Sequence, residues 1–177
     1  MNSKFPIYKE IRPQDLGLEI IPDNDYELQF EAVRGIVKDN KGKIAIIHYS
    51  YHGYHGLPGG KVKGGESQVS TLSRELSKEI GCTVLVGEYL SLAIEWRSPS
   101  KRIKFSYCYL AQVEENFGKL CFSESEQQKG ATLLWFEVDE AIEIMERDAP
   151  TLWKGKYTRA RDLFFLTEAK KALTTGV

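Results

Sequence analysis

The stretch LPGGKVKGGESQVSTLSRELSKEIGC, from Leu57 to Cys82, decides the fold. Its second half predicts a helix over residues 67–80, because Ser67 suits an N-cap and Gly81 suits the position just after a helix. The apolar residues of this helix recur at helical spacing and form one stripe: Val69, Leu72, Leu76 and Ile80. The stripe predicts that one side of the helix packs on a core.

The glycines and charged residues of the same stretch are regularly spaced. A glycine is followed after five residues by an acid, then after seven by an Arg-Glu pair, and finally by an acid and a glycine: Gly60, Glu66, Arg74, Glu75, Glu79 and Gly81. This pattern resembles the box of the Nudix (MutT-like) hydrolase family, and LPGG in front of it is also typical of that family. Lys78 departs from the family pattern, which has a glutamate there. An ordinary amphipathic helix would explain Glu75 and Glu79 but not the spaced glycines.

The resemblance implies a fold and a chemistry. The fold is an α/β/α sandwich, with a mixed β-sheet between helices. The reaction is Mg²⁺- or Mn²⁺-dependent hydrolysis of a phosphoanhydride in a nucleoside diphosphate linked to another moiety. Such a reaction needs carboxylates, because a divalent ion held by them neutralises phosphoryl charge and activates a water.

The resemblance also assigns residues to the metal site. Glu75 and Glu79 stand one above the other on the helix and can share ions. Glu66 and a carbonyl at Gly59 or Gly60 would assist them. Arg74 would pair with the acids and orient them.

Lys78 leaves several interpretations open. At about 100° per residue it is the outermost of Glu75, Lys78 and Glu79, so the inner pair of acids can bind metal without it. It is either a solvated lysine paired with Glu75, or a contact to a substrate phosphate in a working site with fewer or weaker metals. A Nudix-fold domain that binds a nucleotide as a sensor without cleaving it is the alternative function, and an interaction domain without a nucleotide ligand is a third.

Further candidates lie outside the box. The family often supplies another acid from a loop before a late strand, and here Glu126 is preferred slightly over Glu124 as a ligand or general base. Tyr54 and His55 lead into the glycine turn and are candidate substrate contacts, although ordinary strand and loop aromatics are an equal alternative. Zinc at the three histidines is set aside, because no further ligand is near.

The remaining chain predicts a single domain over residues 26–177, preceded by an irregular or extended arm over residues 1–25 that contains three prolines. Strands are expected at 29–38 and 43–50 around the turn DNKG, and then at 83–96, 102–115 and 131–138. A short helix capped by Asp139 and a C-terminal helix over 157–173 complete the pattern.

Composition limits the partners. With 24 Lys+Arg against 25 Asp+Glu, the 177-residue chain has a formal net charge of -1, so no overall field attracts nucleic acid polymers or membranes. A phosphate ligand therefore requires a local site. Three cysteines without CxxC spacing fit a reducing compartment, and a cytoplasmic location is expected. The family resemblance implies a small nucleotide as the substrate, and a homodimer, common in the family, is left open.

Overall fold

The computed structural model describes residues 8–116 and 118–174. A seven-stranded sheet runs through the molecule in the order β1-β5-β6-β2-β3-β4, with β7 also paired to β3. Its strands are β1 (Tyr8–Ile11), β2 (Leu28–Lys38), β3 (Ile44–Tyr49), β4 (Tyr54–Gly56), β5 (Cys82–Arg97), β6 (Arg102–Asn116) and β7 (Ala131–Phe136). The pairs β1–β5 and β2–β6 are parallel and the others antiparallel.

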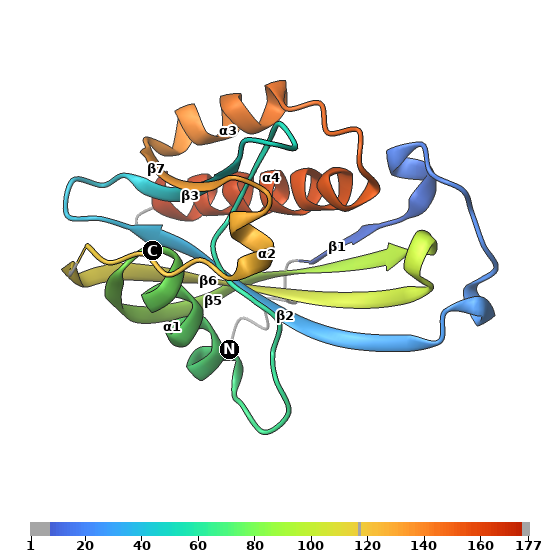
Figure 1. The fold of residues 1–177 in the computed structure, drawn as a ribbon, viewed down its shortest axis with the longest axis horizontal. Coiled ribbons are helices and arrows are strands. Elements are labelled where there is room, and N and C mark those ends of the chain that lie inside the picture. The colour runs from blue at the N-terminus through green and yellow to red at the C-terminus, as the bar shows by residue number, and fades with distance from the viewer. Residues whose placement is uncertain (1–7, 117, 175–177) are drawn as a thin grey trace.

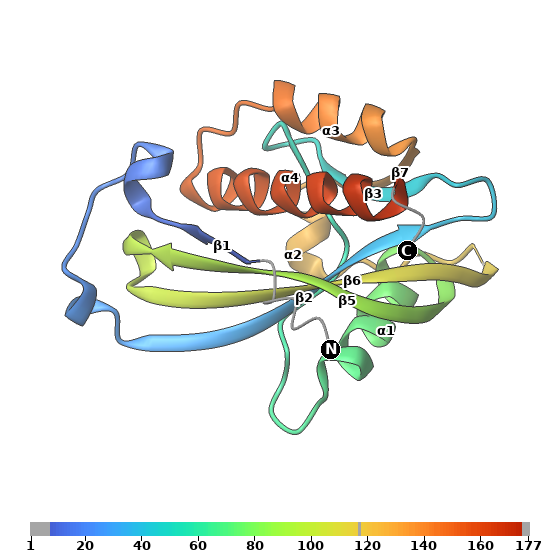
Figure 2. The same ribbon diagram turned by 180° about the vertical axis from the view of Figure 1, so that it is seen from behind.

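Helices cover both faces of this sheet (Figure 1). Helix α1 (Gln68–Glu79) lies on one side, whereas α3 (Val138–Arg147) and α4 (Trp153–Thr174) lie together on the other, and the view from behind agrees (Figure 2). A single turn of helix, α2 (Glu124–Gln127), precedes β7. The predicted α/β/α sandwich with a mixed sheet is confirmed.

Alternation along β2 divides the core between the two faces. Val33 and Val37 belong to the cluster that contains Leu72 and Leu76 of α1, whereas Ile36 belongs to the cluster on the α4 face. This arrangement follows from the two-residue period of a strand, which sends neighbouring side chains to opposite faces. The predicted stripe on α1 is correct except at Val69, which is 46% exposed.

Most of the predicted elements are present. The strands around DNKG form an antiparallel hairpin, and Ser67 caps α1 by accepting a hydrogen bond from the Ser70 N–H. Three boundaries were wrong. The strand expected over residues 131–138 ends at Phe136, because Val138 begins α3. Glu137, not Asp139, is the N-cap of α3 and forms a capping box with Glu140, while α4 begins at Trp153.

Part of the predicted N-terminal arm joins the sheet. Strand β1 pairs with β5, and Ile11 is only 1% exposed. Arg12 forms an ion pair with Asp23 and lies over the Trp96 ring, 3.8 Å from its centroid. Residues 1–7 of the arm lie outside the described residues, and its separation from the domain stays a prediction. None of the helices in the described ranges is long and apolar enough to cross a membrane.

Candidate active site

The LPGG turn is fixed against the edge of β2. Pro58 and Gly60 accept hydrogen bonds from the N–H groups of Gly35 and Val33 through their carbonyl oxygens, at 3.0 and 2.9 Å. Gly59 has φ +137°, and a Cβ there would lie 2.2 Å from the Val33 carbonyl oxygen. Only glycine fits this position. Since the Gly60 carbonyl is engaged with β2, the Gly59 carbonyl is the better of the two predicted backbone ligands.

Glu79 connects α1 to this turn. Its side chain is buried, and its Oε2 accepts a hydrogen bond of 2.8 Å from the Gly59 N–H. Burial, together with the neighbouring carboxylate of Glu126, raises the pKa of Glu79 well above its ordinary value. In Figure 1 the segment that joins β4 to α1 passes α2, the helix that carries Glu126. The structure thus brings two predicted acids together from distant parts of the sequence.

Glu126 is held from its other side by Ser123. The Ser123 N–H and hydroxyl both donate to Glu126 Oε2 at 2.7 Å. Although burial raises the pKa of Glu126, its hydrogen bonds to Glu79 and Ser123 outweigh burial, and the pKa is lowered overall. Of this pair, Glu79 therefore holds a proton more readily, and Glu126 is the more readily ionised. Glu124, the alternative acid on α2, is exposed.

Arg74 binds the two other acids of the box. Its Nε and Nη2 donate to Glu66 at 2.9 and 2.8 Å, and its Nη1 pairs with Glu75. Glu75 also packs against Gly60, where an added Cβ would lie 2.7 Å from the Glu75 Cγ. Glu66 additionally accepts a hydrogen bond from the Thr71 hydroxyl. In this arrangement Arg74 holds Glu66 and Glu75 in place beside the glycine turn.

Lys78 lies on the outer side of the helix. Among the three charged residues, Glu79 is buried, Glu75 is partly buried and Lys78 is exposed, in the order that the helical geometry indicated. Within the described part of the chain its ammonium forms no ion pair, with Glu75 or otherwise. Its backbone carbonyl accepts a hydrogen bond of 2.7 Å from the Cys121 N–H.

The donor atoms at the turn suit a hard cation. No group of three or more His, Cys, Asp or Glu side chains is gathered for a metal within residues 8–116 and 118–174, and Arg74 pairs with Glu66 and Glu75. The oxygens that remain beside one another are those of Glu79 and Glu126, with the Gly59 carbonyl on the adjoining turn. An all-oxygen set of this kind fits Mg²⁺ or Mn²⁺ rather than zinc.

A pocket of about 320 Å³ opens beside the glycine turn. Gly59, Gly60 and Glu126 lie at one part of its wall, and Tyr54 and His52 also line it. His55 does not, because its backbone N–H and its Nδ1 both bond the Asp148 carboxylate. Lys78 is likewise outside the pocket lining.

Cationic side chains dominate the charged lining of the pocket. They come from three strands, from α4 and from two loop positions: Arg34, Lys61, Arg97, Lys104, Lys129, Lys154 and Arg161. The sequence pattern KGKYTRARD offered Lys154 and Arg161 as candidate phosphate contacts, beside a subunit contact or a solvated helix end, but sequence reasoning missed the other five. A usable signal was Glu95 and Lys104, which carry charge at inward positions of otherwise apolar strands, and both are nearly fully buried.

Comparison with known proteins identifies the family of the chain. A NUDIX domain model matches residues 28–159, so the chain belongs to the Nudix family. No curated protein matches it.

Solved structures share the fold. A Nudix hydrolase from Nitrosomonas europaea has 16% identity and a TM-score of 0.56, covering 75% of this chain and 88% of that one. A UDP-X diphosphatase has 16% identity and a TM-score of 0.54, covering 83% and 65%. A MutT protein from Methanosarcina mazei Go1 has 15% identity and a TM-score of 0.51, covering 76% and 93%.

The Arg74–Glu66 pair makes stability depend on pH. Hydrogen bonds from Arg74, and then from Thr71, lower the pKa of Glu66 from 4.5 to about 2. Because the folded pKa is the lower one, this stabilisation is present above about pH 4.5 and is lost as the pH falls toward 2. We expect Glu66→Gln to lower the melting temperature at pH 7, with the difference from wild type shrinking between these two pH values.

Thermal unfolding monitored by circular dichroism across this pH range measures the difference. Glu146→Gln, which removes an exposed acid of α3 far along the chain, controls for the loss of one negative charge. If the melting temperature of Glu66→Gln stays below that of wild type by the same amount as the pH falls from about 4.5 toward 2, the ion-pair account is contradicted.

Proposed function

We propose that this protein is a metal-dependent hydrolase that cleaves a phosphoanhydride in a nucleoside diphosphate linked to another moiety. The observation that carries the proposal is the Glu79–Glu126 carboxyl pair, bonded to the Gly59 turn at the wall of a cationic pocket. Membership of the Nudix family supports hydrolysis of nucleotide derivatives in general. The neighbouring UDP-X diphosphatase acts, by its name, on a nucleoside diphosphate bearing a variable group.

Glu79, Glu126 and the Gly59 carbonyl would hold the ion, with Glu75 and Glu66 as further ligands beside them. A bound Mg²⁺ or Mn²⁺ would supply charge neutralisation at the phosphoryl oxygens and a more acidic water. The residues of this chain would orient the metal ligands and the substrate and would activate the attacking water. Arg74 keeps Glu75 and Glu66 against the turn, and Arg34, which lines the pocket near Gly59, faces the phosphates.

Glu126 is the proposed general base. It is ionised more readily than Glu79, and Ser123 fixes one of its oxygens. A carboxylate held in this way accepts a proton from a water that attacks phosphorus on the pocket side. Tyr54, a buried residue of the same wall, would contact the substrate, whereas His55 is bonded to Asp148 and would support the wall from behind.

A specific observation favours the sensor alternative. Lys78 replaces an acid of the box, and Arg74 engages two of the remaining ones, which leaves fewer free carboxylates for metal. A pocket with this cationic lining would still bind a nucleotide. A turnover assay distinguishes the two functions, because a hydrolase cleaves the nucleotide whereas a sensor only binds it.

A substrate panel with Mg²⁺ and with Mn²⁺ tests the proposal. Nucleoside triphosphates, nucleotide sugars, ADP-ribose and dinucleoside polyphosphates are assayed for phosphate-bond cleavage. We expect turnover of at least one diphosphate-linked compound, and a loss of about a hundredfold or more in kcat for Glu79→Gln and Glu126→Gln. Glu124→Gln, on the same turn of α2, is the matched control and should retain activity.

Full activity of Glu79→Gln would contradict the assignment of Glu79 as a metal ligand. If no compound is cleaved but one raises the melting temperature, the sensor function holds instead. If none is cleaved or bound, both nucleotide functions fail.

Lys78→Glu restores the family pattern at the outer position. We expect this variant to reach half-maximal activity at a Mg²⁺ concentration at least about threefold lower than wild type, since a carboxylate replaces a repelling ammonium. Lys78→Gln, which only removes the positive charge, should give a smaller change. Identical metal dependence for all three proteins would mean that Lys78 is no part of the site.

A further inference from the structure

The pocket wall beyond the glycine turn has an unusual charge composition. Along β6, Lys104, Ser106 and Cys108 share one face of the sheet, and along β5 Glu95 and Arg97 lie on the same face, because alternate residues point the same way. Toward Cys108 this face is apolar core, whereas toward Lys104 it is charged and lines the pocket.

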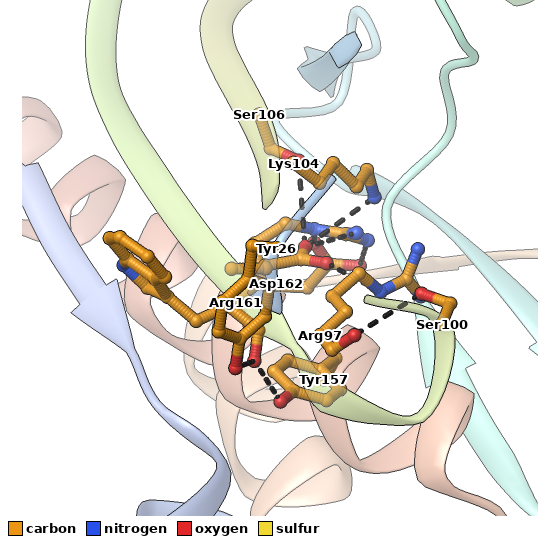
Figure 3. Close-up of polar contacts among 10 residues, drawn as sticks. Tyr26, Arg97, Ser100, Lys104, Ser106, Tyr157, Arg161 and Asp162 are labelled. Carbon is orange, nitrogen blue, oxygen red and sulfur yellow. Dashed lines mark hydrogen bonds and ion pairs between the residues drawn. The ribbon is translucent and has the colours of Figure 1, made fainter. Parts of the chain in front are cut away.

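The ion pairs there leave positive charge in excess. Arg161 of α4 is satisfied by its neighbour, since its Nε and Nη2 donate to the Asp162 carboxylate at 2.6 and 2.9 Å. Its Nη1 also donates to Glu95 at 3.0 Å. Among the described residues, Lys104 and Arg97 then share the single carboxylate of Glu95. Figure 3 shows Lys104, Arg97 and Arg161 converging from β6, β5 and α4.

These two cations hold Glu95 only loosely. The Lys104 Nζ lies 3.4 Å from Glu95 Oε1, and the Arg97 Nε lies 3.3 Å from Glu95 Oε2. Charge-assisted hydrogen bonds are usually shorter, about 2.7–2.9 Å. Indeed both the Arg97 Nε and the Glu95 Oε2 are buried without a hydrogen-bond partner in the described structure.

Burial makes this excess of positive charge energetically unfavourable. Lys104 is 5% exposed, and its burial, followed by the charge of Arg161, lowers its pKa well below the ordinary value. A buried cation without a full partner is stabilised when a negative group is brought to it. Arg97 is also positioned for contact, since the rings of Trp153 and Tyr157 support its guanidinium at 4.9 and 5.6 Å.

Strand order places these cations away from the carboxyl pair. The turn that carries Gly59 bonds one edge of β2, β6 pairs with the other edge, and β5 lies beyond β6. With strands about 4.8 Å apart, the backbones of Lys104 and Arg97 stand roughly 10 to 14 Å across the sheet from the turn. Arg34, on β2, lies between the two groups, since its charge interacts with Glu79 and also with Arg161, Lys104 and Arg97. Lys104 and Arg97, on the strands beyond β2, are then available to another group of the ligand.

We propose that Lys104 and Arg97 bind a second anionic group of the substrate, a phosphoryl or carboxylate group remote from the scissile anhydride. The placement of that anhydride at the glycine turn rests on the proposed function. The site would thereby select substrates that carry three or more negative charges in two separate places, in preference to plain nucleotide sugars or ADP-ribose.

Matched substrate pairs test this selection and separate the two anions. ADP-ribose is compared with its 2′-phosphate, and UDP-glucose with UDP-glucuronate, which differs by a carboxylate. We expect wild type to prefer the anionic member of at least one pair by about tenfold or more in kcat/KM, and the responsive pair identifies the anion. Equal kcat/KM within both pairs would overturn the proposal while leaving the hydrolase function intact.

Lys104→Met assigns the preference to this site. The variant leaves Glu95 paired with Arg161 and Arg97, and should reduce the ratio of the two kcat/KM values within the responsive pair toward unity. Lys41→Met, in the exposed β2–β3 turn, is the control and should keep the preference. A preference that survives in Lys104→Met would overturn the assignment, and the wild-type comparison stands even if this variant fails to fold.

Binding measured by calorimetry covers the case of no turnover. If none of the four compounds is cleaved, the proposed hydrolysis of these substrates fails. Tighter binding of an anionic member by wild type, lost in Lys104→Met, would still support the second anion site. Equal binding within both pairs, or none, would overturn it.

Discussion

The hydrogen bond from the Gly59 N–H to the buried Glu79 carboxylate is the interaction on which the site depends. Gly59 is held by its close approach to the Val33 carbonyl, and Glu79 is held by α1, whose apolar side packs on the same sheet. Two elements are therefore locked together at one atom pair. A side chain at Gly59 would separate them, because the backbone approach leaves no room for a Cβ.

From this junction the charges are arranged in two directions. On the α1 side, acids gather, and Arg74 holds two of them in place. Across β2, on the α4 side, cations gather around the carboxylates of Glu95 and Asp162. The glycine turn lies at the boundary, so that a ligand in the pocket meets carboxyl oxygens at one end and ammonium and guanidinium groups at the other. A chain with a net charge of -1 achieves this only by local segregation of charge.

The sequence predicted what is local. The caps of α1, the exposure order of Glu79, Glu75 and Lys78, and the β2–β3 hairpin follow from spacing along short segments. The site beyond the box could not be read in the same way, because the neighbours of Lys104 depend on the parallel pairing of β6 with β2 and on the register shifts between β5 and β6. His55 illustrates the difference, since its partner Asp148 is remote in sequence. Val69 failed as a core residue because apolar character alone does not show where a helix stops covering the sheet.

The central claim is that Glu79 and Glu126 form a metal centre at the Gly59 turn. Titration with Mn²⁺, followed by electron paramagnetic resonance of the free ion, tests it without any substrate. The account expects Mn²⁺ to bind wild type and Glu124→Gln alike, and to bind Glu79→Gln and Glu126→Gln at least about tenfold more weakly. Equal Mn²⁺ affinity in all four proteins would contradict it.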